Sequence, residues 1–216
     1  MAFKQVKKHP KRSVKSPIKR NSNSQKTTTL EPTPLTGTSP MKQQRLTRIS
    51  DPQFNEAWKL YEQAFPIEER RTLTSQKEVL KAPNYHFELL FEKKKQIGFL
   101  CWWDFENQRY IEHFAIASQE RNKGLGKEIL SFFIKRQNTP ILLEVELPNS
   151  NINKRRIQFY ERMGFLLNKH AYKMPPYQEG QPAVALLLMT YPTAITATAV
   201  AAFIKTCHPI IYNNME

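Results

Sequence analysis

The sequence predicts an α/β domain in which a mostly antiparallel sheet is flanked by helices, preceded by a basic tail over residues 1–40. Short apolar runs that are typical of strands alternate with segments in which apolar residues recur at helical spacing. Three such runs follow one another between residues 85 and 117, and their short polar connections favour antiparallel pairing. With 216 residues, of which 40% are hydrophobic, the chain is long enough for one domain with a sizeable core.

The first 40 residues differ from the rest in composition. They contain nine lysine and arginine residues against one acid, Glu31, and so contribute +8 of the formal net charge of +14. They are rich in Lys, Ser, Thr and Pro and have almost no apolar periodicity, so we expect them to be disordered. Two interpretations stay open: a polybasic arm that makes weak, salt-sensitive contacts with nucleic acid, or a solvated extension before a true start at Met41.

The sequence shows neither an export signal nor a metal-binding pattern. Residues 1–40 lack the apolar stretch of a signal peptide, and Cys101 and Cys207 stand at no metal or redox spacing. We therefore predict a cytoplasmic protein without a metal site. The uncharged run over residues 180–204 exceeds the roughly 20 residues of a membrane crossing, but Pro182 and Pro192 interrupt it, and we expect no membrane span.

From residue 41 to residue 105 the pattern predicts a strand, a helix and a hairpin. Residues 45–50 alternate like a short strand, and Ser50 or Asp51 is a candidate cap for the helix that follows. The apolar residues that share one face of this helix are Phe54, Trp58, Tyr61, and Ala64 or Phe65, and Pro66 then interrupts the helix. The strands expected over residues 85–94 and 96–105 flank a lysine-rich turn, which indicates a hairpin.

The remaining elements alternate between strands and helices. A third strand over residues 109–117 continues the antiparallel meander, and a helix begins near Leu125. After it we expect a strand over 141–147, a helix that carries Tyr160, a strand after Phe165, a last strand over 183–190, an Ala-rich helix over 193–205, and a loose end after His208. The expected domain therefore covers residues 41–192, with a C-terminal segment over 193–216 packed on it.

The turn between residues 121 and 126 joins a strand to a helix and carries chemistry of its own. A helix start leaves about four backbone amides unpaired and carries roughly half a positive charge, which suits phosphate oxygens. Gly124 and Gly126 remove side chains that would block these amides, and Arg121, Lys123 and Lys127 add positive charge. The alternative is a basic, solvated loop, because an isolated G-x-G is a weak signal.

Two segments resemble one family. The turn Arg121-Asn122-Lys123-Gly124-Leu125-Gly126 resembles the R/Q-x-x-G-x-G/A turn of the GNAT superfamily of N-acetyltransferases, which grips the pyrophosphate of acetyl-CoA. Asn153, Tyr160 and the pair Gly164-Phe165 resemble the family's N-x(6)-Y-x-x-x-G-F segment, at the proper distance from the first. The resemblance covers about residues 43–191. The chain departs from the common pattern at Ser118, where relatives often have proline, and at Arg156, where many have alanine.

The resemblance implies a GNAT-like mixed sheet with a V-shaped opening for acetyl-CoA, the co-substrate of N-acetyl transfer. It also implies that the strand before the turn splays from its neighbour and offers main-chain groups to the pantetheine chain. The cofactor-binding residues expected on this basis are Phe114, Ala115, Ile116, Arg121, Asn122, Lys123, Gly124, Leu125, Gly126, Lys127 and Asn153. The amide of Ile116 is expected to stabilise the oxyanion of the reaction intermediate.

Acetyl transfer to an amine needs a base, because an alkyl amine with a pKa of about 10.4 is mostly protonated at neutral pH. Strand alternation predicts Glu112, Phe114 and Ile116 on one face and His113 and Ala115 on the other. In relatives a base often stands on this strand, and Glu112 is therefore our candidate. The alternative is a Glu112 paired with a nearby cation. Glu144 and Glu146, on the next strand, are the reserve candidates.

The departing CoA thiolate needs a proton, and the phenol of Tyr160 is the candidate acid. For the acceptor site, the resemblance points to the loop after the first helix. Strand alternation places Trp102 and Trp103 on opposite faces of the sheet, so we expect one of them in the core and the other at the substrate cavity. The acceptor-binding candidates are Phe65, Glu68, Glu69, Trp102 and Tyr110, with core packing as the alternative for each aromatic residue.

The acceptor itself and the oligomeric state stay open. The acceptor is a small molecule or a protein that bears an amine, and the chain is a monomer or a homodimer. Two rival functions are a nucleic-acid-binding protein that acts through its basic tail, and a GNAT-like module that binds acyl-CoA without catalysis. Direct attack by the amine is favoured over a covalent enzyme intermediate, because no cysteine or serine stands beside a base in a recognisable motif.

Overall fold

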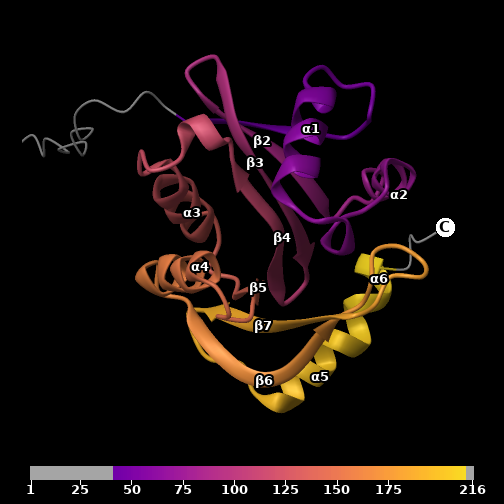
Figure 1. The fold of residues 1–216 in the computed structure, drawn as a ribbon, viewed down its shortest axis with the longest axis vertical. Coiled ribbons are helices and arrows are strands. Elements are labelled where there is room, and N and C mark those ends of the chain that lie inside the picture. The colour runs from indigo at the N-terminus through magenta and orange to yellow at the C-terminus, as the bar shows by residue number, and fades with distance from the viewer. Residues whose placement is uncertain (1–40, 213–216) are drawn as a thin grey trace, which may run out of the picture. The chain divides into compact units, whose positions relative to one another are not determined.

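The computed structural model describes residues 41–212, and the predictions made for residues 1–40 lie outside the described residues (Figure 1). The described part forms one seven-stranded sheet in the order β1-β2-β3-β4-β5-β7-β6. The strands are β1 (Lys42–Leu46), β2 (Tyr85–Glu92), β3 (Lys95–Phe105), β4 (Gln108–Ile116), β5 (Ile141–Glu146), β6 (Leu166–Met174) and β7 (Val184–Tyr191). Only β4 and β5 pair in parallel among them, which confirms the predicted mostly antiparallel sheet.

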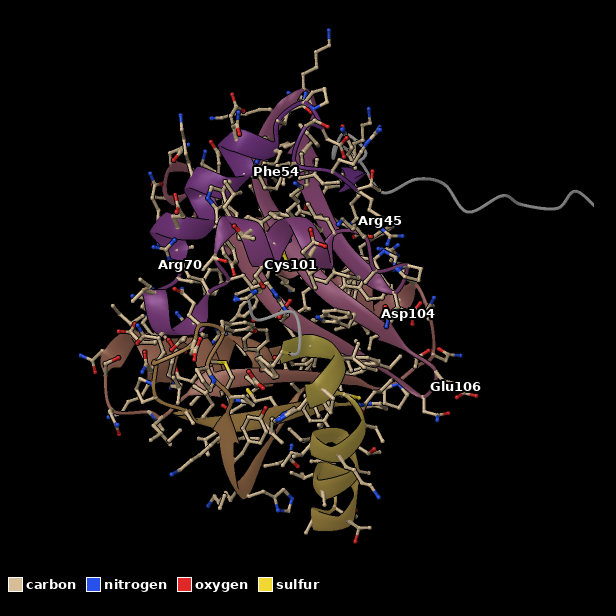
Figure 2. The ribbon with its side chains drawn as sticks, turned by 90° about the vertical axis from the view of Figure 1, so that its right-hand side faces the viewer. Arg45, Phe54, Arg70, Cys101, Asp104 and Glu106 are labelled. Atoms are coloured by element: carbon tan, nitrogen blue, oxygen red, sulfur yellow. The ribbon has the colours of Figure 1, made fainter. Side chains whose placement is uncertain are left out.

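Helices cover both faces of the sheet. They are α1 (Phe54–Ala64), α2 (Leu73–Val79), α3 (Leu125–Lys135), α4 (Asn151–Arg162), α5 (Ala197–Thr206) and α6 (His208–Tyr212), with 3-10 turns η1 (Ile67–Glu69) and η2 (Ser118–Glu120). One core packs α1, α2, α5 and α6 on one face, and a second core packs α3 and α4 on the other. In Figure 2 the first face is toward the viewer, with Phe54 of α1 and Cys101 of β3 between helix and sheet. Of the helices described, none is long and apolar enough to cross a bilayer.

Three local features differ from the sequence-based expectations. The start of α1 is not capped by Ser50 or Asp51: the left-handed residue Gln53 precedes it, and the Asp51 carboxylate accepts hydrogen bonds from the Thr47 and Arg48 amides. The pattern did not predict α2, which is capped by the Thr72 hydroxyl. The chain after residue 207 is not a loose end up to residue 212, because α6 packs into the first core.

A bulge in β4 changes the face on which Glu112 lies. Cys101 of β3 pairs with His113 and the next residue, Trp102, pairs with Ile111, so Glu112 is an extra residue without a partner in β3. The predicted alternation is therefore wrong for Glu112, which shares the face of His113. The alternation is confirmed for Phe114 and Ile116, which pack against the second core, and for Ala115, which belongs to the first.

Candidate functional site

A cavity of about 990 Å³ opens where β4 and β5 separate. Pairing between the two strands runs only from Arg109 opposite Ile141 to Ile111 opposite Leu143, whereas β4 continues to Ile116 and β5 to Glu146. The residues beyond the last pair line the cavity on both sides. The expected splaying of these strands is therefore present, and it leaves main-chain groups of β4 unpaired on the side of β5.

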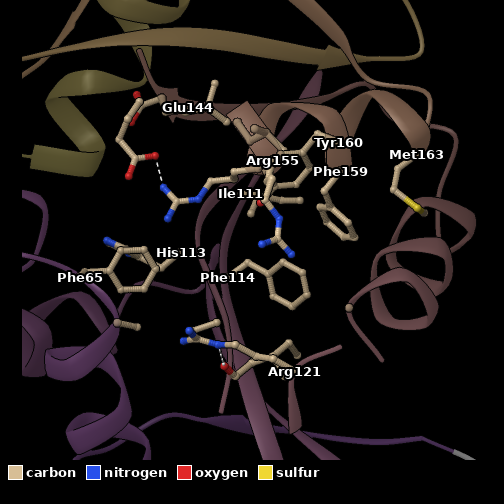
Figure 3. A pocket seen from close by; sticks show the side chains of 18 of the residues that line it. Phe65, Ile111, His113, Phe114, Arg121, Glu144, Arg155, Phe159, Tyr160 and Met163 are labelled. Carbon is tan, nitrogen blue, oxygen red and sulfur yellow. Dashed lines mark hydrogen bonds and ion pairs between the residues drawn. The ribbon is translucent and has the colours of Figure 1, made fainter. Parts of the chain in front are cut away.

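The hydrogen-bonding pattern between β3 and β4 decides which main-chain groups face the cavity. The amide of Ala117 donates to the carbonyl of Ile97 over 2.9 Å, and in an antiparallel pair the bonded positions alternate. The peptide groups of Phe114 and Ile116 therefore point away from β3 into the opening. Those of Ala115 pair with β3, so its predicted main-chain role is not supported. The Ile116 carbonyl accepts a hydrogen bond of 3.0 Å from Arg121 Nε (Figure 3).

The predicted phosphate-binding turn has the backbone geometry that such a role needs. Asn122 and Gly124 adopt left-handed conformations, with φ of 64° and 82°, and α3 begins directly after them. Within the described residues, the amides from Asn122 to Gly126 have no backbone acceptor. These amides stand at the positive end of α3, and an anion that enters the cavity meets them directly.

Most of the predicted cofactor-binding residues line the cavity, but Lys123 and Asn153 do not. Lys123 Nζ lies 2.8 Å from the Glu120 carboxylate, which holds the ammonium group beside η2. The Asn153 side chain instead donates to the carbonyl of Leu147 over 2.9 Å, and so ties α4 to the end of β5. The Lys123 ammonium group and the Asn153 side-chain amide therefore both have partners within the fold.

The acceptor-binding candidates divide in the same way. Phe65 and Glu69 line the cavity, whereas Glu68, Trp102 and Tyr110 do not. Trp102 lies in the second core, where its ring stacks on His86 with 4.0 Å between centroids. Tyr110 packs in the first core against α5. Neither ring lines the cavity, because helices cover each face of the sheet and each ring packs beneath them in one of the two cores.

Glu112 lines the cavity, but its side chain is held by a buried network. Its side chain and that of Arg71 have exposed fractions of 0% and 1%, and Arg71 Nη1 lies 2.6 Å from Glu112 Oε1. Tyr177 donates to the same oxygen over 2.8 Å, and Trp103 Nε1 donates to the other over 3.2 Å. Both carboxylate oxygens are therefore engaged, as in the paired alternative considered above.

Glu144 and Glu146 lie on β5 and both line the cavity. Burial raises the pKa of Glu144 to about 7, although the Tyr172 hydroxyl, which donates to this carboxylate, acts in the opposite direction. Glu146 forms an ion pair with Arg156. Burial also raises the pKa of Glu69, and the charge on Glu146 adds to that rise. The β5 side of the cavity thus holds an acid whose pKa suits proton exchange at neutral pH.

Tyr160 lines the cavity from α4, on the side opposite Phe65 and His113 (Figure 3). Its ring packs against Phe165 with 5.6 Å between centroids. Burial raises the pKa of Tyr160 to about 12, so the phenol keeps its proton at neutral pH. A protonated hydroxyl at this position is able to donate to a group bound between β4 and β5.

Sequence reasoning missed other cavity residues on α4 and at its C-terminal end. Arg155, Phe159 and Met163 point into the cavity beside Tyr160 (Figure 3). Arg156, noted only as a departure from the family pattern, also lines it. Helical spacing contained the signal for Arg156 and Met163, because positions four and three residues from Tyr160 share its face, but not for Arg155 and Phe159. Arg121, Arg155 and Arg156 therefore bring positive charge to the cavity, and Arg156 is paired with Glu146 of β5.

Comparison with known proteins places these features in a family. A family model described as an acetyltransferase (GNAT) domain matches residues 83–166. A search of curated protein sequences gave no match. A solved GNAT-family structure from Bacteroides thetaiotaomicron, assigned as an acetyltransferase, is 35% identical with a TM-score of 0.74, and the match covers 79% of this chain and 98% of that one.

Two more distant structures share the fold alone. Ard1 from Thermoplasma volcanium is 17% identical, with a TM-score of 0.52 over 69% of this chain and 95% of that one. An acetyltransferase from Thermus thermophilus is 16% identical, with a TM-score of 0.51 over 71% of this chain and 97% of that one. From the family model and the Bacteroides structure together, the chain belongs to the GNAT family of acetyltransferases, enzymes whose co-substrate is acetyl-CoA.

Proposed function

We propose that this enzyme transfers the acetyl group of acetyl-CoA to a primary amine by direct attack. The amine is carried by a small molecule or a protein. Its nitrogen attacks the thioester carbonyl carbon, the C–S bond breaks, and the products are an acetamide and free CoA. The observation that carries the proposal is the opening between β4 and β5, where unpaired amides face a carboxylate with a pKa of about 7 and a protonated phenol.

The residues present fit acetyl-CoA. The amides from Asn122 to Gly126 and the side chain of Lys127 suit the pyrophosphate at the start of α3. The unpaired peptide groups of Phe114 and Ile116 suit the amides of the pantetheine chain. The amide of Ile116 also suits the oxyanion that forms when the amine attacks, because a fixed donor at that point stabilises the developing charge.

We propose Glu144, rather than Glu112, as the base that takes the amine proton. Glu112 was the candidate from the sequence, but its oxygens are engaged by Arg71, Tyr177 and Trp103. Glu144 lines the cavity and its pKa of about 7 lies near the working pH, where general bases are most effective. Tyr160 is the proposed acid that protonates the departing thiolate.

The acceptor side of the cavity favours a cationic amine. Glu69, Glu144 and Glu146 line it together with the ring of Phe65, and within the described residues only Glu146 of these three is paired with an arginine. Carboxylates beside an aromatic ring attract an ammonium group until its proton is lost. Neither cysteine lines the cavity, since Cys101 and Cys207 are buried in the first core, and this supports direct attack over a covalent intermediate.

We also propose that the acetyltransferase domain extends beyond residue 192. Val200 and Phe203 of α5 and Ile211 of α6 are at most 5% exposed and belong to the first core. Removal of these helices would uncover that core, so we regard them as part of the domain.

The proposed function is tested by release of free CoA. Purified full-length protein is incubated with acetyl-CoA and a panel of polyamines, amino acids, aminoglycosides and peptide amines, and the thiol produced is measured. We expect amine-dependent CoA release with at least one class, and mass spectrometry should find the acetylated amine. Binding of acetyl-CoA by calorimetry without CoA release in any arm would instead support the non-catalytic module.

Tyr160→Phe is expected to lower kcat by about a hundredfold or more, with little change in acetyl-CoA affinity, because it removes only the proton donor. The measurement is CoA release with the best amine of the panel. Tyr191→Phe is the matched control: both rings pack on Phe165 with 5.6 Å between centroids, but Tyr191 does not line the cavity. An unchanged kcat in Tyr160→Phe would remove Tyr160 from the mechanism.

The two glycines of the turn are expected to respond differently to alanine. Gly124→Ala should destabilise the protein by about 1–2 kcal/mol, because Gly124 has φ of 82° and an L-residue is strained there. Gly126→Ala should keep the stability, because its added Cβ makes ordinary contacts with the ring of Phe159, at 3.6 Å, and with Ile116 Cγ1, at 4.0 Å. It should weaken acetyl-CoA binding by narrowing the approach to the amides. Thermal unfolding and calorimetry separate the two effects. Equal affinities in wild type and Gly126→Ala would contradict the pyrophosphate site.

A further inference from the structure

A chain of hydrogen bonds runs from Glu144 away from the cavity. The hydroxyl of Tyr172, on β6, donates to Glu144 Oε1, and Nε2 of His208, at the start of α6, lies 2.9 Å from the same hydroxyl oxygen. Tyr172 and His208 are 5% and 8% exposed, and neither lines the cavity. Three elements far apart in the sequence therefore meet behind one carboxylate, and the two outer residues act on bound substrate only through Glu144.

We propose that Tyr172 and His208 are positioning residues that orient the Glu144 carboxylate and favour its charged form. The inference rests on the proposed function for its catalytic meaning, since it concerns the residue that we assign as the base. It gives the C-terminal helix α6 a part in the reaction, although no atom of His208 reaches the cavity.

The proton count on the three groups supports this arrangement. A phenol has one proton, and when Tyr172 gives it to Glu144, its oxygen is free to accept from the Nε2–H of His208. Burial lowers the pKa of His208 to about 4, so its imidazole is neutral at neutral pH, and the Nε2–H tautomer supplies this donor. His208 is otherwise enclosed by aromatic rings of Phe203, Tyr172 and Tyr212. Hydrogen bonds aligned in one direction strengthen one another, and their sum favours the carboxylate.

The surroundings of Glu144 explain why it needs such donors. The titratable groups that face it are Tyr110 and Glu112 of β4, Glu69 of η1, Tyr172 of β6, Tyr177 after β6 and Tyr212 of α6. Burial has the largest effect and raises the pKa of Glu144, and the charges on Glu112 and Glu69 raise it further. Only the hydroxyls of Tyr172 and Tyr110 act in the other direction. Without the Tyr172 hydroxyl, a larger fraction of Glu144 would hold a proton at neutral pH.

The experiment is a ¹³C NMR titration of the side-chain carboxyl groups in full-length protein labelled at glutamate. The signal that is absent in Glu144→Gln identifies Glu144, and its midpoint is expected near the pKa of about 7. We expect Tyr172→Phe to raise this midpoint by about one pH unit, because it removes a hydrogen bond to the charged form. His208→Leu should raise it by less, and His208→Gln, which keeps an N–H donor, should restore it toward the wild-type value.

Tyr85→Phe is the matched control. Tyr85 is 1% exposed and its hydroxyl is bonded to Gln76 over 3.2 Å, so this variant also loses a buried hydrogen-bonded hydroxyl, but one that does not face Glu144. Its Glu144 midpoint should stay at the wild-type value. The proposal is overturned if Tyr172→Phe leaves the midpoint unchanged, or if Tyr85→Phe moves it as far.

The titration needs no acceptor, so its outcome is independent of the proposed function. In a second arm, the pH dependence of kcat/KM for CoA release is measured in wild type, Tyr172→Phe and Glu144→Gln. An acid limb that follows the NMR midpoint supports both proposals. If Tyr172→Phe moves the NMR midpoint of Glu144 but leaves the acid limb of kcat/KM in place, the positioning pair is supported and Glu144 is overturned as the base. If Tyr172→Phe leaves the NMR midpoint of Glu144 unmoved and the acid limb of kcat/KM is lost in Glu144→Gln, only the positioning pair is overturned.

Discussion

Glu144→Gln is expected to lower kcat/KM for amine acetylation by about 10²- to 10⁴-fold, the usual contribution of a general base. The amide is close to the carboxylate in shape and its oxygen still accepts from Tyr172, so the cavity and its affinity for acetyl-CoA should be unchanged. Calorimetry with acetyl-CoA and a thiol assay for CoA release are the two measurements.

The pH dependence of kcat/KM is a second test of Glu144→Gln. Since burial raises the pKa of Glu144 to about 7, the wild-type base gains a proton as the pH falls through neutrality, and kcat/KM should fall on the acid side. This acid limb should disappear in Glu144→Gln, whose side chain does not titrate. A variant that keeps both the wild-type rate and the limb would show that another group takes the amine proton.

Glu112→Gln is expected to destabilise the protein by about 3–5 kcal/mol, because it leaves the buried guanidinium of Arg71 without its counter-charge. Arg71 is 1% exposed, and its guanidinium also donates a hydrogen bond to the carbonyl of Ile211 in α6. Loss of the charge therefore weakens the packing of α6 as well as that of β4. Urea unfolding followed by fluorescence measures the free energy of unfolding.

A second variant separates charge from shape. Arg71→Met combined with Glu112→Gln removes both charges, and its free energy of unfolding should lie closer to the wild-type value than that of Glu112→Gln alone. If Glu112→Gln instead unfolds like the wild type but loses acetyl transfer, the sequence-based assignment of Glu112 as the base is right and the assignment of Glu144 is wrong. The two glutamate variants therefore decide between the two carboxylates by different observables.

Local pattern was sufficient for much of the fold. The strands β2, β3 and β4, the glycine turn before α3 and the helix that carries Tyr160 are all visible in the sequence, because side-chain periodicity and turn residues are properties of neighbouring positions. The helix α2 was not visible, since its seven residues are too few for a clear period. α6 was missed for the same reason: its five residues are held by the core and by Arg71.

The sequence by itself determined the family, the α/β class, the cavity-facing turn at residues 121–126 and Tyr160 as a cavity residue. Only the tertiary structure shows how each carboxylate is held. The extra residue in β4 turns Glu112 toward Arg71. The hydroxyl of Tyr172, which lies 28 positions further along the chain, donates a hydrogen bond to Glu144. Periodicity describes neighbours along the chain, whereas a bulge and a long-range hydrogen bond depend on how separate strands pack.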